Sequence, residues 1–365
     1  MHKICHLSSV HKRDDIRIFR KQCVSLSKAS YNTFLIIADN LKDEKIGNIQ
    51  ILDVGKDSSR LKRMYFTTKR IYKKALEIDA DLYHFHDPEL LIVGLKLLKK
   101  NKKVIFDSHE DLPRQIIGKP YLKKYLKPVF SFLFEKLENY AAKKFTYIIT
   151  ATPTIRDRFI KINKNTLDIN NYPLVNELHS DTFIQTKKNQ ICYVGGITII
   201  RGLKYLIDSL EFTNVKLKIA GGFENELFKK ELMQSKGWRN VEELGFISRE
   251  HVKKLLAESK AGIVTFLPLP NHIDAQPNKI FEYMSASLPV IGSDFDLWKQ
   301  IIEVNNCGIC VNPTSPKEIA NAINTIIEDS NLARLMGENG RKIVEEKFNW
   351  EKEEIKLINI YKKIL

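Results

Sequence analysis

The sequence predicts an α/β protein made of two doubly wound, Rossmann-like domains. Apolar runs typical of strands alternate with runs that have helical spacing, which is the order of a parallel sheet covered by helices. The same alternation starts again at Gln190–Val194, after an irregular polar stretch at residues 170–189. A length of 365 residues is enough to give each domain its own core. We therefore place one domain at residues 1–172 and the other at residues 173–349, with a final helix at residues 350–365.

The apolar runs of the first domain predict six strands. Helices are expected at Ile16–Lys28, at Ser59–Glu77, which is basic and amphipathic, and at Leu90–Leu98 and Thr154–Ile162. The six strands are Lys3–Leu7, Thr33–Ala38, Ile49–Val54, Leu82–Phe85, Lys103–Phe106 and Tyr147–Ala151.

The second domain repeats this pattern. The expected strands are Gln190–Val194, Val215–Ala220, Val241–Leu244, Ala261–Leu267, Leu288–Ile291 and Gly308–Asn312. The expected helices are Leu203–Leu210, Asn225–Gln234, Arg249–Glu258, Asn278–Ser287, Pro316–Glu328, Leu332–Phe348 and a terminal helix from Asn349 to Leu365.

Composition favours a soluble globular protein, since apolar residues make up 43% and charged residues 28% of the chain. The first residues do not resemble a signal peptide, and no apolar run approaches the length of a membrane span. The five cysteines are widely spread, and an odd number of them favours reduced thiols. We therefore expect a cytoplasmic protein, held at the inner face of the membrane if it is attached at all.

The formal net charge of +15 is concentrated in the first domain. Residues 1–172 hold 34 Lys and Arg against 19 Asp and Glu, whereas the rest of the chain is balanced. Residues 116–144 interleave lysines with aromatic side chains, which is typical of an element that contacts an anionic membrane surface. The alternative is two ordinary helices, separated at Pro128, whose lysines face water. The same mixture could stack single-stranded nucleic acid, but no nucleic-acid fold signature is present, and we expect no nucleic-acid partner.

A phosphate site is predicted where the helix following Pro277 begins. Pro277 suits the first helical position, and the amide groups of that turn favour an anion. Lys279 lies in this turn, Glu282 follows on the same face, and Asp274 precedes them in the loop. The alternative is an ordinary surface helix.

A second anion-binding loop is predicted after the strand Gln190–Val194. Gly195 and Gly196 allow the backbone to approach a ligand closely, and Arg201 can bind a diphosphate with two N–H groups. The alternative is a simple turn before the next helix.

The loops of the first domain carry titratable side chains instead of glycines. The loop after the first strand holds His11, Asp15 and Arg17 but no glycine, which argues against a dinucleotide-binding dehydrogenase. The neighbouring strands end at residues 86–89 and 107–111, and both segments contain histidine and carboxylate residues. A solvated helix face is the alternative for Arg17 and Lys21, and we prefer it for Lys21.

Several motifs together resemble the family 4 retaining glycosyltransferases, of the bacterial group 1 type. The matching segments are the Asp274-x7-Glu282 motif with P-N-K-x-F-E-Y-M, the loop Y-V-G ending in Arg201-Gly202, H-x-H-D-P-E-L, D-x-H-E-D, and S-V-H-x-x-x-D-x-R-I-F-x-K. Asp274 stands where the family usually has Glu, and Gly196 where many members have Arg. The resemblance implies the GT-B fold, in which two Rossmann-like domains face a central cleft and the C-terminal helix crosses back to the first domain.

The resemblance also implies roles for individual residues. Arg201, Lys279 and the helix start at Asn278 would stabilise a departing diphosphate, Glu282 would bind the ribose, and Asp274 the sugar hydroxyls. The loop of Phe246 and Ile247 would lie near the nucleotide base. His109 would act near the donor sugar, while the acceptor side would involve His11, Asp15, Arg17 and Glu110. We expect no metal and no cofactor, since the fold uses a nucleoside diphosphate sugar alone.

These inferences predict a retaining glycosyltransferase that acts on a glycan or lipid-linked acceptor, in envelope polysaccharide or lipid-linked glycan synthesis. A sugar-nucleotide epimerase of the same architecture is the first alternative, and it would need no acceptor. A basic adaptor without enzymatic activity is the second, and it would bind no nucleoside diphosphate.

Overall fold

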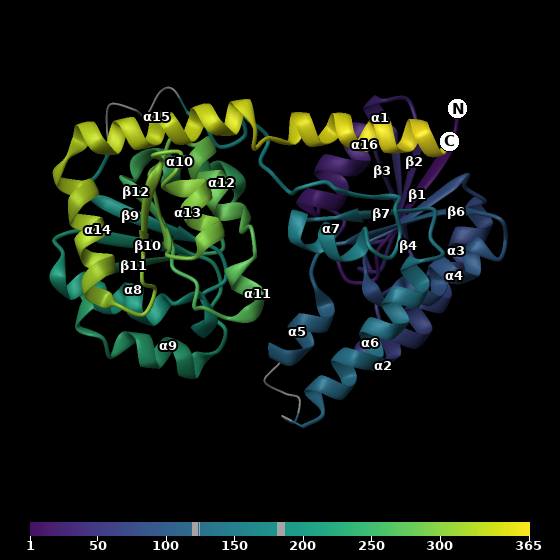
Figure 1. Cartoon of the computed structure of the whole chain (residues 1–365), viewed down its shortest axis with the longest axis horizontal. Helices are drawn as coiled ribbons and strands as arrows, with labels where there is room; N and C mark the ends of the chain where they lie inside the picture. Colours follow the sequence, from purple (N-terminus) through teal and green to yellow (C-terminus); the bar gives the residue numbers. More distant parts are fainter. Residues whose placement is uncertain (119–122, 124, 181–186) are drawn as a thin grey trace. The chain divides into compact units, whose positions relative to one another are not determined.

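The computed structural model describes residues 1–118, 123, 125–180 and 187–365, which form two compact units (Figure 1). Unit 1 comprises Met1–Asn171 and Lys352–Leu365, and unit 2 comprises Tyr172–Glu351. Each unit holds one largely parallel sheet with helices on both faces. The predicted α/β class with two Rossmann-like domains is confirmed.

Unit 1 contains an eight-stranded sheet in the order β3-β4-β2-β1-β5-β6-β7-β8. All neighbouring strands are parallel except β3, which pairs antiparallel with β4. The strands are β1 (Lys3–Leu7), β2 (Asn32–Ile37), β3 (Glu44–Ile46), β4 (Ile49–Asp53), β5 (Leu82–Phe85), β6 (Lys103–Ser108), β7 (Tyr147–Thr150) and β8 (Thr166–Asp168).

Helices cover both faces of this sheet. One face packs against residues of α3, α4, α6 and α7, and the other against η1 and α16. The helices are η1 (Ile16–Cys23), α1 (Val24–Lys28), α2 (Arg60–Lys62), η2 (Arg63–Thr67), α3 (Thr68–Ile78), η3 (Pro88–Leu90), α4 (Leu91–Leu98), α5 (Leu112–Gly118), α6 (Lys127–Ala142), α7 (Pro153–Phe159) and α16 (Trp350–Ile364). Because both faces are covered, the central strands are largely buried, and most of their residues are apolar.

Unit 2 contains a six-stranded, wholly parallel sheet in the order β11-β10-β9-β12-β13-β14. The strands are β9 (Gln190–Val194), β10 (Lys216–Ala220), β11 (Val241–Gly245), β12 (Ala261–Val264), β13 (Val290–Ser293) and β14 (Gly308–Val311). The helices are η5 (Ile199–Arg201), α8 (Leu203–Ser209), η6 (Leu210–Phe212), α9 (Glu226–Met233), η7 (Lys236–Asn240), α10 (Arg249–Glu258), α11 (Pro270–Ile273), α12 (Asn278–Ser285), α13 (Asp296–Ile302), α14 (Pro316–Glu328) and α15 (Ser330–Glu346).

Some local features differ from the sequence prediction. Strands β3 and β8 were not predicted, β12 ends at Val264 rather than Leu267, and the short helix α11 follows it. Pro277 is the N-cap of α12 instead of its first helical residue, and Pro128 lies in the first turn of α6. Lys119, Tyr121 and Lys124 of the expected interfacial stretch lie outside the described residues, as do residues 181–186 of the expected linker.

The terminal helix α16 belongs to unit 1 from Lys352 onward. Leu357 and Tyr361 of this helix are fully buried, which agrees with the predicted return of the C-terminus to the first domain. Within the described residues, no helix combines the length and the apolar character needed to cross a bilayer.

Candidate active site

The candidate anion site of unit 2 lies where the strand order reverses. β9 is paired with β10 on one side and with β12 on the other, and ligands of doubly wound sheets bind beyond the carboxyl ends of such strands. The loops after β9 and β12 contact each other there, since the Leu267 amide donates to the Ile200 carbonyl at 3.0 Å. Gly202 has φ +71°, and a Cβ at this position would overlap the Thr265 carbonyl. Glycine therefore allows the two loops to meet.

Two cationic side chains converge on Gly195 at this edge. A Cβ built on Gly195, which has φ +140°, would overlap the end of the Lys279 side chain and lie 3.1 Å from Arg201 Nη1. Arg201 Nη1 donates to the Gly196 carbonyl at 3.4 Å, and Tyr193 Oη donates to the same carbonyl at 2.7 Å. The structure thus brings together Gly195, Gly196, Arg201 and Lys279, all predicted from the sequence.

The charge of these two cations is not balanced locally. Among the described residues, no carboxylate lies within ion-pair distance of Arg201 or Lys279. Burial lowers the pKa of Lys279 to about 8, with a further contribution from the Arg201 charge that Glu282 partly offsets. A bound dianion would relieve this electrostatic cost.

The start of α12 adds backbone donors. Its N-cap is Pro277, whose side chain has no atom that could accept a hydrogen bond from the first amide groups. Asn278 and Lys279 are the first two helical residues. Free N–H groups and the helix dipole at such an end favour an anion.

The two carboxylates of the predicted motif have different surroundings. Glu282 Oε1 accepts from Arg249 Nη1 at 2.9 Å, and Glu177 holds the rest of that guanidinium, so the orientation of Glu282 is fixed. Asp274 is exposed at the end of α11. Its loop is anchored next to it, because Trp298 Nε1 donates to the Ala275 carbonyl at 2.8 Å.

The loop after β11 carries the predicted base-side residues. Phe246 is 89% exposed, and Ile247 packs partly against the core. Phe246 also lies over Gly222, where a Cβ would approach its ring to 2.8 Å. A ring exposed to this extent is available to a flat ligand.

Unit 1 has its own reversal of strand order, between β1 and β5. Asp87, which follows β5, is buried and accepts from the Ser9 amide at 2.6 Å and from Ser8 Oγ at 2.9 Å. His11 Nδ1 lies 2.9 Å from the other Asp87 oxygen. Burial lowers the pKa of His11, but the hydrogen bond and charge of Asp87 outweigh it and leave the pKa raised. The cationic form of His11 is therefore favoured.

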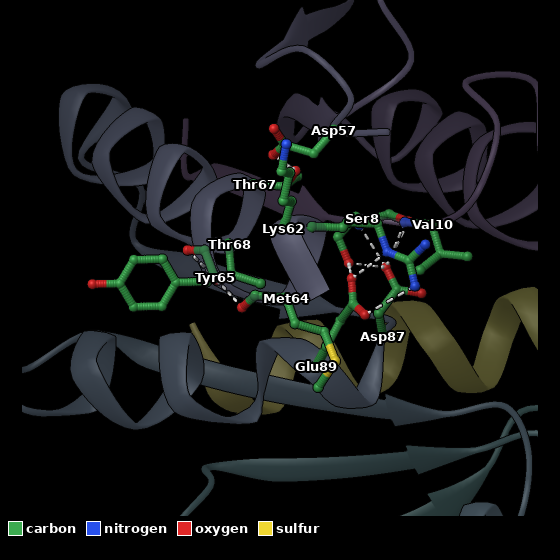
Figure 2. Close-up of polar contacts among 12 residues, drawn as sticks. Ser8, Val10, Asp57, Lys62, Met64, Tyr65, Thr67, Thr68, Asp87 and Glu89 are labelled. Atoms are coloured by element: carbon green, nitrogen blue, oxygen red, sulfur yellow. Dashed lines mark hydrogen bonds and ion pairs between the residues drawn. The ribbon is translucent and has the colours of Figure 1, made fainter. Parts of the chain in front are cut away.

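The same loop is tied to the helical segment that follows β4 (Figure 2). Ser9 Oγ donates to Glu89 Oε1 at 2.6 Å, and Arg63 binds both oxygens of Glu89 at 2.9 and 3.2 Å. Arg63 of η2 is thus connected through Glu89 and Ser9 to Asp87, the partner of His11.

Arg17 supports the site from beneath. It is only 4% exposed, and it binds Asp107 with two N–H groups, at 2.7 and 3.0 Å, and the Ile169 carbonyl at 2.7 Å. Its guanidinium is therefore committed to Asp107, which corrects the expectation that it contacts an acceptor directly. Lys21 is also buried and donates to Asn171, so the prediction of a solvated Lys21 is wrong. Asp15 caps η1 by accepting from the Ile18 amide.

Six side chains beneath the loops form a closed ring of polar contacts. His109 Nε2 lies 3.2 Å from His86 Nδ1, and His86 Nε2 lies 2.9 Å from His6 Nδ1. Tyr361 Oη lies 3.3 Å from His6 Nε2 and 2.8 Å from His84 Nδ1. Asp107 Oδ2 closes the ring, at 3.7 Å from His84 Nε2 and 3.2 Å from His109 Nε2. We call His6, His84, His86, His109, Asp107 and Tyr361 the histidine ring.

Hydrogen-bond accounting fixes the tautomer of His109. Ionised Asp107 only accepts, so His109 Nε2, which lies 3.2 Å from Asp107 Oδ2, carries a proton. His84 Nε2 lies 3.7 Å from the same oxygen and has no hydrogen-bond partner among the described residues. The contacts among His84, Tyr361, His6 and His86 are compatible with either direction of donation. In neutral His109 the proton-free nitrogen is therefore Nδ1.

The protonation states of the buried members of the ring follow from burial and charge. Burial lowers the pKa of His6, His84 and His86, in the last case to about 3, so each carries a single ring proton near neutral pH. Burial would raise the pKa of Asp107, but the charge of Arg17 and bonds from His109 and His86 keep it well below its usual value.

The histidine ring contains a set of atoms with metal-ligand spacing. His86 Nδ1, Asp107 Oδ2 and His109 Nε2 lie 3.2–3.3 Å from one another. However, Asp107 Oδ2 already accepts from Arg17 and from Gln22 Nε2 at 2.8 Å, and the guanidinium would repel a cation. The set does not fit a resident metal ion.

Sequence reasoning missed several residues of the site. His6, His84 and Tyr361 are separated by long stretches of chain, so only the fold brings them to His109. His272 of α11 is buried beside Phe266, with ring centroids 5.1 Å apart, and the Arg201 charge helps to lower its pKa after burial. Glu110, which was predicted for the acceptor side, is exposed and contacts Gln115.

Comparisons with known proteins find glycosyltransferases among the similar sequences and structures. Residues 175–343 match the family of glycosyl transferases group 1, and residues 36–167 match Glycosyltransferase Family 4. The glycosyltransferase MJ1607 of Methanocaldococcus jannaschii is 30% identical over 49% of this chain, and the match spans about half (46%) of that relative's length. The D-rhamnosyltransferase WbpZ of Pseudomonas aeruginosa is 26% identical over 74% of this chain and 70% of WbpZ. The structure of Anabaena Alr3699/HepE in complex with UDP-glucose aligns over the whole of both chains, with a TM-score of 0.74 and 19% identity.

Proposed function

Because this chain belongs to the group 1 and family 4 type of glycosyltransferases with the GT-B fold, we propose that it transfers a sugar from a nucleoside diphosphate sugar to an acceptor hydroxyl. One observation carries the proposal. Arg201 and Lys279 converge on Gly195 at the strand reversal of unit 2, without a carboxylate partner among the described residues. Two such cations beside free helix amides suit the diphosphate of the donor.

In this proposal, unit 2 binds the donor and stabilises its departure. Arg201, Lys279 and the amides at Asn278 meet the charge that develops on the leaving diphosphate, a preorganised electrostatic role. Glu282, held by Arg249, binds the ribose, and Asp274 binds sugar hydroxyls. Phe246 and Ile247 contact the base. The two cations supply the charge that a metal would otherwise provide, so the proposal requires no metal and no cofactor.

Unit 1 provides the residues for the sugar and the acceptor. His109 offers the proton-free Nδ1 as a hydrogen-bond acceptor for a hydroxyl of the transferred sugar, while His11 and Glu110 position the acceptor. The bond from the anomeric carbon to the phosphate oxygen breaks as the bond to the acceptor oxygen forms on the same face. The acceptor proton passes to the leaving phosphate oxygen, which retains the anomeric configuration.

The basic first half supports a lipid-linked or envelope glycan acceptor at the inner face of the membrane. Helix α6 exposes apolar side chains next to lysines, among them Val129, Phe130, Phe132, Leu133 and Tyr140. We include contact between residues 116–144 and an anionic membrane in the proposal. Sugar transfer from a nucleotide donor is supported by the name of WbpZ, a D-rhamnosyltransferase, and by the complex of HepE with UDP-glucose.

A panel of nucleotide sugars, screened by thermal shift, tests the proposal, since a ligand that binds the folded state raises the melting temperature. The donor that binds is then incubated with acceptors, and proton NMR reads the anomeric configuration of the product. We expect the configuration of the donor. An inverted product would remove the retaining mechanism, and epimer formation without acceptor would favour the epimerase. Failure of every nucleotide to bind would favour the adaptor.

A further inference from the structure

The helical segment after β4 carries a charge of one sign. Between Asp57 and Glu77 the chain contains seven basic residues and no acidic ones. Ion pairs are made by Arg63 with Glu89, by Arg70 with Asp57 and by Lys74 with Glu77. In the described part of the chain, no carboxylate pairs with Lys62, Lys69 or Lys73, which are all exposed. The segment therefore presents a net positive surface.

The first two turns of this segment also expose large apolar side chains. Leu61 is 80% exposed and Tyr65 67%, while Met64 and Phe66 are each about half exposed. The rings of Tyr65 and Phe66 contact each other edge to face, with centroids 5.0 Å apart. By contrast, Ile71 and Ala75 in α3 are fully buried. The later turns thus anchor the segment to the core while α2 and η2 leave their apolar side chains in water.

Apolar and aromatic side chains surrounded only by positive charge are typical of elements that lie in the headgroup layer of an anionic bilayer. A surface that binds a protein partner more often carries charges of both signs around an apolar centre. The charge of the segment therefore favours a lipid surface over a protein. Figure 2 shows Tyr65 pointing away from the contacts of Ser8, Asp87 and Glu89.

We propose that α2–η2 (Arg60–Thr67) docks unit 1 onto an anionic lipid bilayer. Leu61, Met64, Tyr65 and Phe66 enter the headgroup layer, and the lysines face the lipid phosphates. Arg63 ties the docked segment through Glu89 to Ser9, in the loop that holds His11. The membrane surface is thereby placed next to the acceptor loop. It follows that the acceptor is a lipid-linked glycan, and this second conclusion rests on the proposed function.

Vesicle flotation of the full chain tests the docking. Vesicles of phosphatidylcholine alone are compared with vesicles that contain about 30 mol% phosphatidylglycerol. We expect binding to the anionic vesicles only, weakened by salt. The double variant Tyr65→Ser/Phe66→Ser should reduce the partition coefficient at least about tenfold, and Lys62→Ala about fivefold. Phe212→Ser, an equally exposed phenylalanine in unit 2, should bind as the wild type does.

The outcomes separate this inference from the earlier proposals. Absence of binding to anionic vesicles, or unchanged binding of the Tyr65/Phe66 variant, would overturn the docking role of α2–η2. Loss of binding in Phe130→Ser/Phe132→Ser alone would assign the membrane contact to α6 instead. Nucleotide-sugar binding, measured on the same variants by calorimetry, should not change. If no nucleotide sugar binds the wild type, the proposed function fails while the docking result stands.

Discussion

Removal of the Tyr361 hydroxyl should disturb His109 through two intervening groups. In Tyr361→Phe, His84 Nδ1 and His6 Nε2 lose their shared partner, both in fully buried positions. An unsatisfied buried polar group costs about 1–3 kcal/mol, so we expect unit 1 to lose about 2–6 kcal/mol of unfolding free energy. His6 is then free to adopt the other tautomer. His86, whose Nε2 lies 2.9 Å from His6, can shift its own ring proton in response, and its Nδ1 lies 3.2 Å from His109.

Tyr83→Phe is the matched control for this prediction. The Tyr83 hydroxyl is also buried and makes two hydrogen bonds, to the Ala75 carbonyl at 2.6 Å and from the Ala80 amide at 2.9 Å, outside the histidine ring. Urea unfolding should show similar destabilisation in both variants. Only Tyr361→Phe should change the nitrogen-15 NMR signals of His109 and lower turnover, by about two- to tenfold. Equal turnover in the two variants, with unchanged His109 signals, would refute the connection between Tyr361 and His109.

Three further predictions follow from individual contacts. Arg201→Ala should lower turnover about 10²–10³-fold, as for other donors to a developing anion, and near-full activity in steady-state kinetics would remove its phosphate role. A bound diphosphate should raise the pKa of Lys279 from about 8. Donor affinity, measured by calorimetry, should therefore be constant below pH 8 and fall by up to about tenfold per pH unit above it, and Lys279→Met should show no such fall. Histidines that are held neutral in the fold bind protons once the chain unfolds, so the free energy of unfolding decreases as the pH falls below about 6.5. The decrease is about 1.4 kcal/mol per pH unit for each such histidine, and for His86 it continues toward the folded pKa of about 3. Because all three tryptophans lie in unit 2, acid should reduce circular dichroism before it changes tryptophan fluorescence, and coincident transitions would contradict this.

Much of the fold could be predicted from the sequence because the signals are local. Most parallel strands of both units are runs rich in apolar residues, and most of their bounds agree with the structure to within one or two residues. Strands β3 and β8 were missed because each has only three residues, and all three residues of β3 are exposed, so neither produces a clear pattern. Position 128 shows the limit of a local rule, since proline is tolerated in the first turn of a helix as well as between helices.

The site of unit 2 was more predictable than that of unit 1. Gly195, Arg201 and Lys279 lie in loops whose positions follow directly from the alternation of strands and helices. In unit 1 the burial of Arg17 and Lys21 could not be predicted, because their partners Asp107 and Asn171 are remote in sequence. The contact of Tyr361 with the histidines depends on a terminal helix whose packing leaves no local signal.

The central claim is that a diphosphate binds against Gly195 between Arg201 and Lys279. Calorimetric titration of the wild type and two variants with uridine and guanosine diphosphates tests it most directly. We expect one of the nucleotides to bind the wild type, and Lys279→Ala to weaken that binding by at least about tenfold, since a charged hydrogen bond contributes about 1.5–3 kcal/mol. Lys204→Ala, which removes an exposed lysine from the adjacent helix α8, should bind as the wild type does. Equal affinity of the wild type and Lys279→Ala would contradict the account.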